Sequence, residues 1–517
     1  MQVVITEMEE LSGKSSRSSE STIPVSAFQP RLLSNTRTRT RTFGQAVLAI
    51  AKIGASTGTG RCTMEEELED KHVPAERQRA IIGLETATKQ LLLAVTGREE
   101  LDKLRQDSWL WYLQHLHRKV VPVWNALMCQ TIDGLSNEQT PDDISAVAAV
   151  RHVMAEVAES LFGYGEVTLP DIVDHLKNVP SGVQYNEGKT VSLLRDAEGD
   201  LPTHLAFQTT GWLTGIWDPV PNVSHPYFRL SGSLPPRRRA GLRPDPIIRN
   251  IELSIKEWQN QPIHRVAARF GKLFPSPDLH LQDDTLGSRD MESACLTAAY
   301  ISWHSLKDMV GVSLNWTGIL AQHLEYDQQQ KKLYVFKYPS ICLLLCRKGP
   351  RTLLSDIFQE QHQEVASGQR AVTPQGLEFD SCLAEVLLSY PLIFARNSRS
   401  RKSIKKKLAM LGNECDPLLR LLCGKEDTPE MDLLYRELNA EPAENYVPIA
   451  DFPFLARKLI QLQKLSMGRN PHSFRRLWRD RRNLLAWFAL WAVLIITALT
   501  LIFQMLQLVF QIWTPAG

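Results

Sequence analysis

The stretch LLAWFALWAVLIITALTLIFQMLQLVFQIW, residues 484–513, decides the architecture of this chain, because none of its side chains is charged. A hydrocarbon core about 30 Å thick is crossed by roughly 20 apolar residues in a helix. Residues 484–503 supply that length, and little of the sequence follows the stretch. We therefore expect a single C-terminal transmembrane helix at 484–513 that holds the protein in a membrane, as in tail-anchored proteins.

Arginines directly before this stretch predict its orientation. Residues 475–482 read RRLWRDRR, and no Lys or Arg follows the helix in this sequence. Basic residues that flank a spanning helix lie preferentially on the cytoplasmic side. Residues 1–14 carry acidic side chains and no apolar core, which argues against a secretory signal or a mitochondrial transit peptide. We expect a cytosolic body anchored in the ER or another endomembrane.

Aromatic and amide side chains are expected to interact at the ends and on one face of this helix. Trp prefers the headgroup level, so the expected membrane-interface residues are Arg475, Arg476, Arg479, Arg481, Arg482, Trp487, Trp491 and Trp513. Spacings of three and four place Gln504, Gln507 and Gln511 on one helical face. That face is a candidate contact for a partner transmembrane helix or for self-association. The alternative is that the span ends near Phe503 and the glutamines lie in the interface.

Composition restricts the function classes. The chain has 517 residues, 43% of them hydrophobic, with a formal net charge of +2. This is enough apolar content for a core, and the balanced charge predicts no nucleic-acid partner. Eight cysteines without a CxxC pair indicate reduced cytosolic thiols. The expected partners are the lipid bilayer, a transmembrane helix and a cytosolic protein, and no cofactor is expected.

Periodicity predicts a mainly α fold with a small β-hairpin near 333–345, an α+β segment, in addition to the transmembrane helix. The expected regions are a disordered tail at 1–45, a helical region at 46–219, a Pro/Arg-rich linker at 220–245, an α+β region at 246–395, a basic linker with short helices at 396–450, a membrane-proximal amphipathic and basic segment at 451–483, and the membrane helix at 484–513.

Individual elements follow from local patterns. Helices are expected over 75–130, from Thr140 to about 161, and over 168–176, 246–258, 263–270, 291–309 and 378–392. Residues 315–324 are also expected to be helical. A polar turn at 327–332 and strands at 333–336 and 341–345 complete the predicted hairpin region. An amphipathic helix is expected around 454–465, near the bilayer or packed on the body.

Seven basic residues lie between Arg396 and Lys407, interleaved with Ser398, Ser400 and Ser403. Such a run fits an anionic cytosolic leaflet, from which phosphorylation would release it. It also fits a nuclear import signal or a solvated loop. The sequence leaves these three interpretations open.

Catalytic and metal-binding patterns are weak. Residues 54–58 read GASTG, which fits the G-x-S-x-G nucleophile motif around Ser56, but a Gly/Ser/Thr linker explains it better. His115 and His117 are poorly placed for one metal, and Asp278, His280, Asp283 and Asp284 lack further ligands. Ser302, His304 and Asp308 suggest a triad, but His304 and Asp308 are more simply a surface pair. His323 has two open interpretations, a functional residue or a histidine that holds a helix against the hairpin. We assign no catalytic, cofactor or metal residue.

Two short segments carry a resemblance. NWTGILAQHL at 315–324 is followed by LYVF at 333–336 and PSIC at 339–342. Near the membrane helix, FP at 452–453, LW at 477–478 and DRR at 480–482 precede Trp487. Over about 310–345 and 450–513 the chain resembles a large group of uncharacterised filamentous-fungal proteins with a C-terminal transmembrane helix. The resemblance implies the membrane anchor and a fungal origin, and it implies no activity, fold or ligand.

Two functional hypotheses follow. The favoured one is a non-enzymatic, membrane-anchored interaction or scaffold protein whose cytosolic body recruits a partner. The alternative is a membrane-tethered, hydrolase-like enzyme with a site assembled from residues distant in sequence. The sequons at Asn222 and Asn315 would be reached by glycosylation only if the body were luminal.

Overall fold

The computed structural model describes residues 75–163, 166–179, 192–195, 199–220, 226–230, 252–271, 273–275, 295–346, 353–366, 379–467 and 484–513. All of them belong to the unit Gly60–Gly517. The expected tail at 1–45 and most of the expected linker at 220–245 lie outside these residues. The described part is mainly helical with small sheets, as the sequence predicted.

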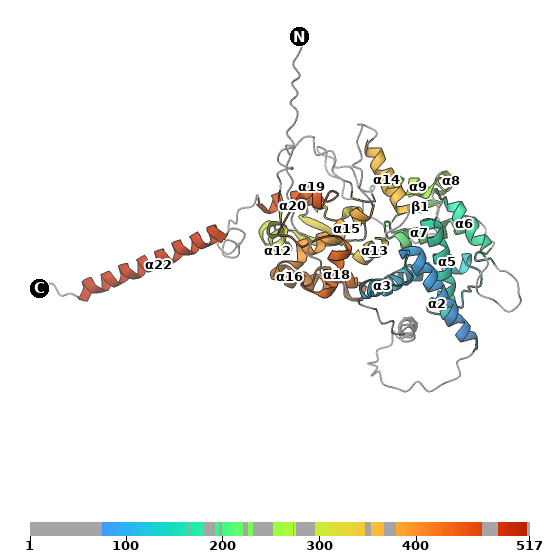
Figure 1. Cartoon of the computed structure of the whole chain (residues 1–517), viewed down its shortest axis with the longest axis horizontal. Coiled ribbons are helices and arrows are strands. Elements are labelled where there is room, and N and C mark those ends of the chain that lie inside the picture. Colours follow the sequence, from blue (N-terminus) through green and yellow to red (C-terminus); the bar gives the residue numbers. More distant parts are fainter. Residues whose placement is uncertain are drawn as a thin grey trace, which may run out of the picture. The chain divides into compact units, whose positions relative to one another are not determined.

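The helices expected over 75–130 are present and pack on two later ones. The elements are α2 (Ala75–Thr96), α3 (Lys103–Val120), η1 (Val121–Val123), η2 (Trp124–Met128), α4 (Cys129–Thr131), α5 (Ile144–Gly163), α6 (Leu169–Asn178) and α7 (Leu201–Thr214). α2 lies along α5 (Figure 1). Buried Arg151 of α5 donates to the Thr88 hydroxyl of α2 at 2.7 Å. This bond fixes the two helices in one register.

Two predicted helix starts give different results. α6 begins as expected, because the Thr168 side chain accepts from the Asp171 N–H and the Asp171 side chain accepts from the Thr168 N–H, a capping box. The start predicted at Thr140 is wrong. There the Asp143 carboxylate accepts the Thr140 N–H at 2.8 Å and closes a turn, and α5 begins at Ile144. α5 ends at Gly163, close to the expected end at about 161.

The middle of the chain contributes short strands and short helices. β1 (Tyr227–Arg229) pairs antiparallel with β2 (Glu252–Ser254), so the described end of the helix expected at 246–258 is a strand followed by α8 (Ile255–Trp258). α9 (Ile263–Phe270) lies where it was predicted. The helix expected at 291–309 is divided into β3 (Leu296–Thr297), α11 (Ala298–Ile301), α12 (Trp303–Ser305) and the π-helix η3 (Leu306–Val310). β3 leaves the helical path because it pairs with distant β7 (Asn445–Tyr446).

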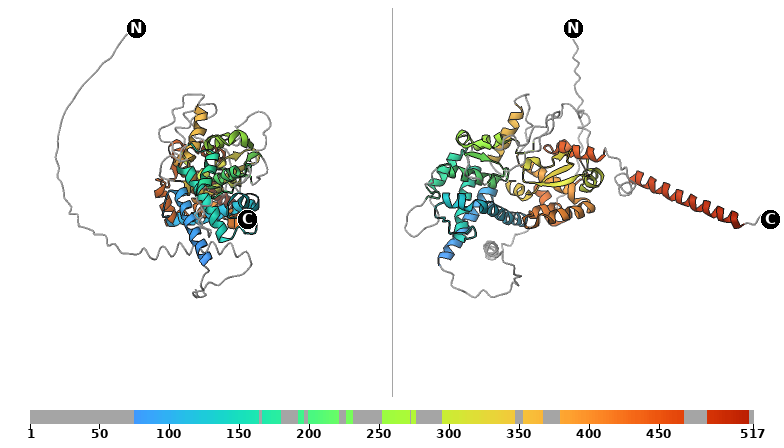
Figure 2. Two further views of the ribbon diagram at one scale, coloured as in Figure 1. Left: turned by 90° about the vertical axis from the view of Figure 1, so that its right-hand side faces the viewer. Right: turned by 180° about the vertical axis from the view of Figure 1, so that it is seen from behind.

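The principal sheet differs from the predicted hairpin. Its strand order is β4-β6-β5, with β4 (Ser313–Thr317) parallel and β5 (Tyr326–Asp327) antiparallel to central β6 (Lys332–Phe336). A hairpin therefore exists, but it joins β5 to β6. The prediction of a helix at 315–324 is wrong for the first residues, because they belong to β4 and are extended by parallel pairing with β6. Within this segment only η4 (Leu320–Gln322) is helical. Figure 2 shows these strands among helices.

The strand expected at 341–345 is a helix, α13 (Pro339–Leu345). A short, wholly apolar run does not distinguish a buried strand from a buried helix. The deciding contact comes from far along the chain: Asp416 accepts the Ser340 N–H at 2.8 Å in the first turn of α13. The helix is buried along its length and packs against α3 and two later helices, α15 (Phe379–Tyr390) and α17 (Pro417–Leu422).

The last part of the body is helical. Its elements are α14 (Leu353–Ala366), α15 (Phe379–Tyr390), η5 (Pro391–Ala395), α16 (Ser398–Ala409), η6 (Gly412–Glu414), α17 (Pro417–Leu422), α18 (Pro429–Glu437), α19 (Pro448–Asp451) and α20 (Ala456–Met467). The expected amphipathic helix is α20. Its apolar face, with Leu459 and Leu462, is buried against the body. Of the two expected settings, the structure therefore shows the packed one.

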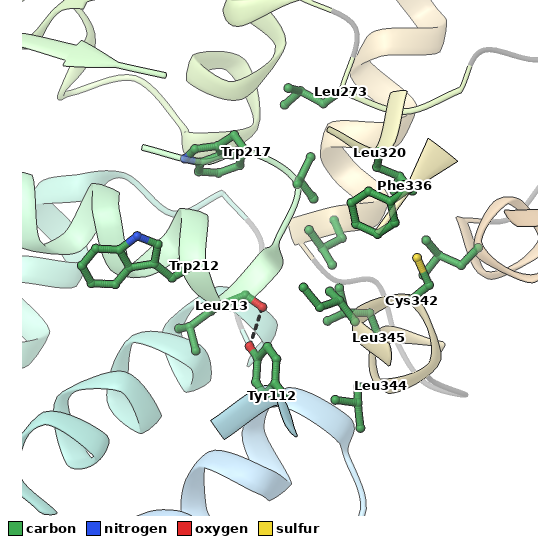
Figure 3. Close-up of a cluster of buried hydrophobic side chains, with 14 of the residues drawn as sticks. Tyr112, Trp212, Leu213, Trp217, Leu273, Leu320, Phe336, Cys342, Leu344 and Leu345 are labelled. Carbon is green, nitrogen blue, oxygen red and sulfur yellow. Dashed lines mark hydrogen bonds between the residues drawn. The ribbon is translucent and has the colours of Figure 1, made fainter. Parts of the chain in front are cut away.

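One continuous set of buried side chains, from Leu91 to Leu462, joins these elements. Figure 3 shows its centre, where α3, α7 and α13 meet. The Tyr112 hydroxyl of α3 donates to the Leu213 carbonyl of α7 at 2.7 Å. α7 then ends at Gly215 in a left-handed conformation, φ 62°, and a Cβ there would lie 2.7 Å from the Ile341 side chain. Glycine thus permits both the turn and the close approach of α13.

The C-terminal apolar helix has the predicted bounds. α22 runs without interruption from Leu484 to Trp513 (Figure 1). Its 30 residues correspond to about 45 Å at 1.5 Å per residue. This length exceeds the thickness of a bilayer's hydrocarbon core and is close to that of a bilayer with its interfaces.

Candidate functional site

The first candidate site is the surface of α22. Residues Trp491–Phe510 have a mean hydropathy of 2.3, and none of that span is buried against protein. No other helix in the described ranges is long and apolar enough to cross a membrane. An exposed apolar surface of this size needs lipid or another protein around it. The helix is therefore compatible with membrane anchoring.

The expected interface residues are only partly visible. Arg475, Arg476, Arg479, Arg481 and Arg482 lie outside the described residues. Trp487 and Trp513 lie in α22, although their side chains are outside the described set, and Trp491 opens the apolar span. Their interfacial role stays a prediction.

The proposed polar face of α22 lies on regular helix. Gln504 and Gln507 are exposed and fall inside the span Trp491–Phe510, whereas Gln511 follows it. α22 continues past Phe503, so helical geometry places the three glutamines on one side. Whether they contact a partner helix stays a prediction.

A second candidate site lies on the body, where α16 packs against α12 and η3. Arg396–Lys407 is not a loop, because Ser398–Ala409 is helical with Asn397 as its N-cap. Buried Ser400, Ile404 and Leu408 form the attached face. The Ser400 hydroxyl accepts the backbone N–H of His304 at 2.9 Å. The opposite side of the helix is cationic, with six basic and no acidic residues in α16.

The predicted pair of His304 and Asp308 is confirmed, with 3.1 Å between Nδ1 and the carboxylate. Arg399 of α16 lies 3.3 Å from the other ring nitrogen of His304. Since a guanidinium only donates, Nε2 is the acceptor and Nδ1 carries the proton toward Asp308. Ser302 does not complete a triad. Its hydroxyl is buried, caps α12, and bonds the Ala299 carbonyl and the Ser305 hydroxyl.

His323 joins β6 to α15 through its two ring nitrogens. It is fully buried, its Nδ1 accepts the Phe336 N–H of β6 at 3.2 Å, and its Nε2 lies 2.7 Å from Ser389 Oγ of α15. The Ser389 hydroxyl donates to the Val386 carbonyl, so the imidazole is neutral with its proton on Nε2. Burial, reinforced by nearby Lys458, holds the pKa of His323 well below its usual range.

Sequence reasoning missed the buried carboxyl of Glu385. One oxygen accepts the N–H groups of Phe454 and Leu455 at 2.8 and 3.0 Å, directly before α20. Among the described atoms the other oxygen has no hydrogen-bond partner. Burial raises the pKa of Glu385 to about 9, although the two donors oppose the shift. A single Glu within a helical pattern carries no sequence signal for this environment.

The remaining candidates do not form a site in the described residues. His115 is buried and stacked on Trp111, and burial lowers its pKa to about 3. His117 instead pairs with Asp142 at 3.2 Å. Ser56, Asp278, His280, Asp283 and Asp284 lie outside the described residues. No group of three His, Cys, Asp or Glu residues within the described ranges is arranged to hold a metal ion.

Comparison with known protein families, with curated proteins and with solved structures gives no match to this chain.

Proposed function

We propose that this protein is a membrane-anchored interaction protein, held by α22 and carrying a cytosolic body that recruits a protein partner to an endomembrane. The observation that carries this proposal is the unburied apolar surface of Trp491–Phe510. Its transfer from water into lipid is favourable by about 25 cal/mol per Å² of apolar area. Within the described residues, no part of the body buries this apolar surface.

The orientation rests on charge. The five arginines at 475–482 precede α22, and the positive-inside tendency favours the cytosol for that side. The ER or another endomembrane is the proposed location, and the bilayer is the first partner. The suggested resemblance of 310–345 and 450–513 to filamentous-fungal proteins with a C-terminal transmembrane helix supports the anchor alone.

An interaction role is favoured over an enzymatic one because three buried polar groups of the described body have structural contacts. His323 joins β6 to α15, Ser302 caps α12, and Glu385 accepts two N–H groups ahead of α20. No described contact favours the hydrolase-like alternative.

The test is the topology of the full chain on microsomes, with a tag at the N-terminus. Digestion of the tag by added protease, with no glycosidase-sensitive shift, is the expected result. Asn315 is a suitable reporter because its side chain is exposed on β4. A protected tag with sugar at Asn315, lost in Asn315→Gln, would overturn the cytosolic body. Extraction of the protein by carbonate would overturn the anchor.

A further inference from the structure

A hollow of about 680 Å³ lies between η3 and α16 on the body. Four cationic side chains line it, Lys307, Arg399, Lys402 and Lys406, and Asp308 is the one carboxylate among the lining residues. We call this the basic groove. Its charge is local, since the whole chain is nearly neutral.

Hydrogen bonds orient several of the side chains that line the basic groove. The Ser403 hydroxyl accepts hydrogen bonds from Trp303 Nε1 at 3.2 Å and from Lys307 Nζ at 2.8 Å. With both lone pairs engaged, the hydroxyl hydrogen is the part of Ser403 available to an acceptor in the groove. Arg399 is oriented by His304, which is itself oriented by Asp308. Two of the four cations are therefore held in place before any ligand binds.

Three of the four cations form a row on α16. Arg399, Lys402 and Lys406 follow one another at spacings of three and four, so they share a helical face. Like charges at these spacings destabilise a helix, and α16 contains no acid to offset them. From Arg399 to Lys406 the row is about 10.5 Å long at 1.5 Å per residue. That length exceeds one phosphate group and matches a ligand that carries several.

We propose that the basic groove binds a polyphosphorylated inositol headgroup, presented by a lipid of the membrane that α22 spans. Arg399 would contact one phosphate through its planar fork, and the lysines would contact others as point charges. The lipid source rests on the proposed cytosolic body. α20 ends at Met467 and α22 begins at Leu484, so the intervening chain allows at most about 60 Å between them. This tether keeps the groove at high effective concentration near the leaflet.

The test uses the full chain in nanodiscs and compares two double variants. Lys402→Gln with Lys406→Gln removes two charges from the groove. Lys405→Gln with Lys407→Gln removes two exposed charges from the same helix, outside the groove lining. In phosphatidylcholine discs, soluble inositol trisphosphate should bind the unsubstituted chain. We expect at least tenfold weaker binding for the groove variant and little change for the control.

The second measurement is hydrogen exchange of α16 in discs of three compositions: phosphatidylcholine alone, with phosphatidylinositol bisphosphate, or with phosphatidylserine at equal charge. Protection only with the inositol lipid supports the proposal. Equal protection with phosphatidylserine would indicate a non-specific contact of α16 with an anionic leaflet, and it would overturn the proposal.

Other outcomes are also decisive. Protection by the soluble compound but not by the lipid would overturn the lipid source, and equal losses in the two variants would overturn the groove. Tighter binding of RNA or of a phosphopeptide would overturn the ligand class. Nanodiscs expose both faces of the bilayer. If the chain does not bind the inositol ligand in nanodiscs although protease reaches the body on microsomes, only the groove proposal is overturned. A luminal body found on microsomes sinks the proposed function instead.

Discussion

Asp416 binds Ser340 across 76 positions of the chain, accepting its N–H at 2.8 Å and its hydroxyl at 2.6 Å. The same carboxylate accepts the Leu418 N–H at 2.8 Å and so caps α17. One fully buried side chain thereby positions the first turns of two helices, α13 and α17. Burial raises the pKa of Asp416 to about 6, and its hydrogen-bond donors, which also include the Leu419 N–H at 3.4 Å, oppose that shift.

Asp416→Ala should lower the free energy of unfolding by about 2–4 kcal/mol, because it removes a cap and leaves buried donors unpaired. Urea denaturation of the full chain in detergent measures this. Asp427→Ala is the control, since the Asp427 side chain is 85% exposed and should change stability by less than about 0.5 kcal/mol. Equal effects of the two substitutions would contradict the double-cap role.

Glu385→Gln should change how stability depends on pH. The pKa of Glu385 is about 9 in the folded protein against 4.5 for an unperturbed glutamate, so the folded state retains the proton over that interval. The contribution of Glu385 to the free energy of unfolding is therefore fully present below pH 4.5, and it falls by about 1.4 kcal/mol per pH unit toward pH 9. Gln keeps an acceptor for Phe454 and Leu455 and does not titrate.

Unfolding midpoints at pH 5 and pH 8 test this prediction. The difference between the two midpoints should be smaller in Glu385→Gln than in the unsubstituted chain. Glu441→Gln changes an exposed carboxyl and should leave the difference as it is. An unchanged pH dependence in Glu385→Gln would show that the carboxyl is ionised in the fold.

His323 should produce a slope of the opposite sign. Because its folded pKa lies well below 6.5, the unfolded chain binds the extra proton, and stability is complete above pH 6.5 and lost as the pH falls. His323→Ala should cost about 2–4 kcal/mol at pH 7.5, since Ser389 and the Phe336 N–H lose their partner.

His323→Gln retains a donor and an acceptor, and it should remove part of the loss of stability below pH 6.5. Denaturation at pH 5 and pH 7.5 measures that loss. His175→Gln, at a side chain 37% exposed, serves as the matched substitution. A His323→Ala protein as stable as the unsubstituted chain would rule out the bridging role between β6 and α15.

Charges placed in the middle of α22 should prevent membrane insertion. Leu499→Arg with Leu501→Arg adds about 2.5–3.5 kcal/mol per residue to the insertion free energy. We expect the variant to become extractable by carbonate. Leu499→Ile with Leu501→Ile keeps the apolar surface and should stay in the membrane fraction. Retention of the double arginine variant would mean that α22 does not span the bilayer.

The glutamine face should contribute to helix association. Replacing Gln504 and Gln507 by Leu should weaken self-association or partner binding by about 0.6 kcal/mol per lost hydrogen bond. Energy transfer between labelled chains in bilayers measures self-association. Thr500→Val is the control, because the Thr500 hydroxyl already bonds the Ile496 carbonyl of its own helix. No difference between the variants would place the glutamines in the interface.

Local patterns were sufficient where the deciding interactions are local. α22, α9 and the Thr168 capping box follow from residues within a few positions of each other. The same holds for the pair of His304 and Asp308, which are one helical turn apart. These features depend on the spacing of residues within one helix, and this spacing can be read directly from the sequence.

The candidate sites were predictable only in part. The basic run at Arg396–Lys407 was visible as composition, but its helix, its buried Ser400 and its groove against Lys307 were not. The buried environment of Glu385 was also hidden, because its hydrogen-bond donors, Phe454 and Leu455, lie about 70 positions away. A side chain's pKa depends on what surrounds it in space.

The sequence by itself determined that this protein has a helical body and a membrane-compatible helix at 484–513, because apolar periodicity and length require no distant partner. Only the tertiary structure decided that β4 pairs with β6, that residues 339–345 form a helix, and that α16 faces η3 across a basic groove. Each of these depends on a contact between segments separated along the chain. Such contacts select among conformations that local propensity leaves nearly equal in free energy.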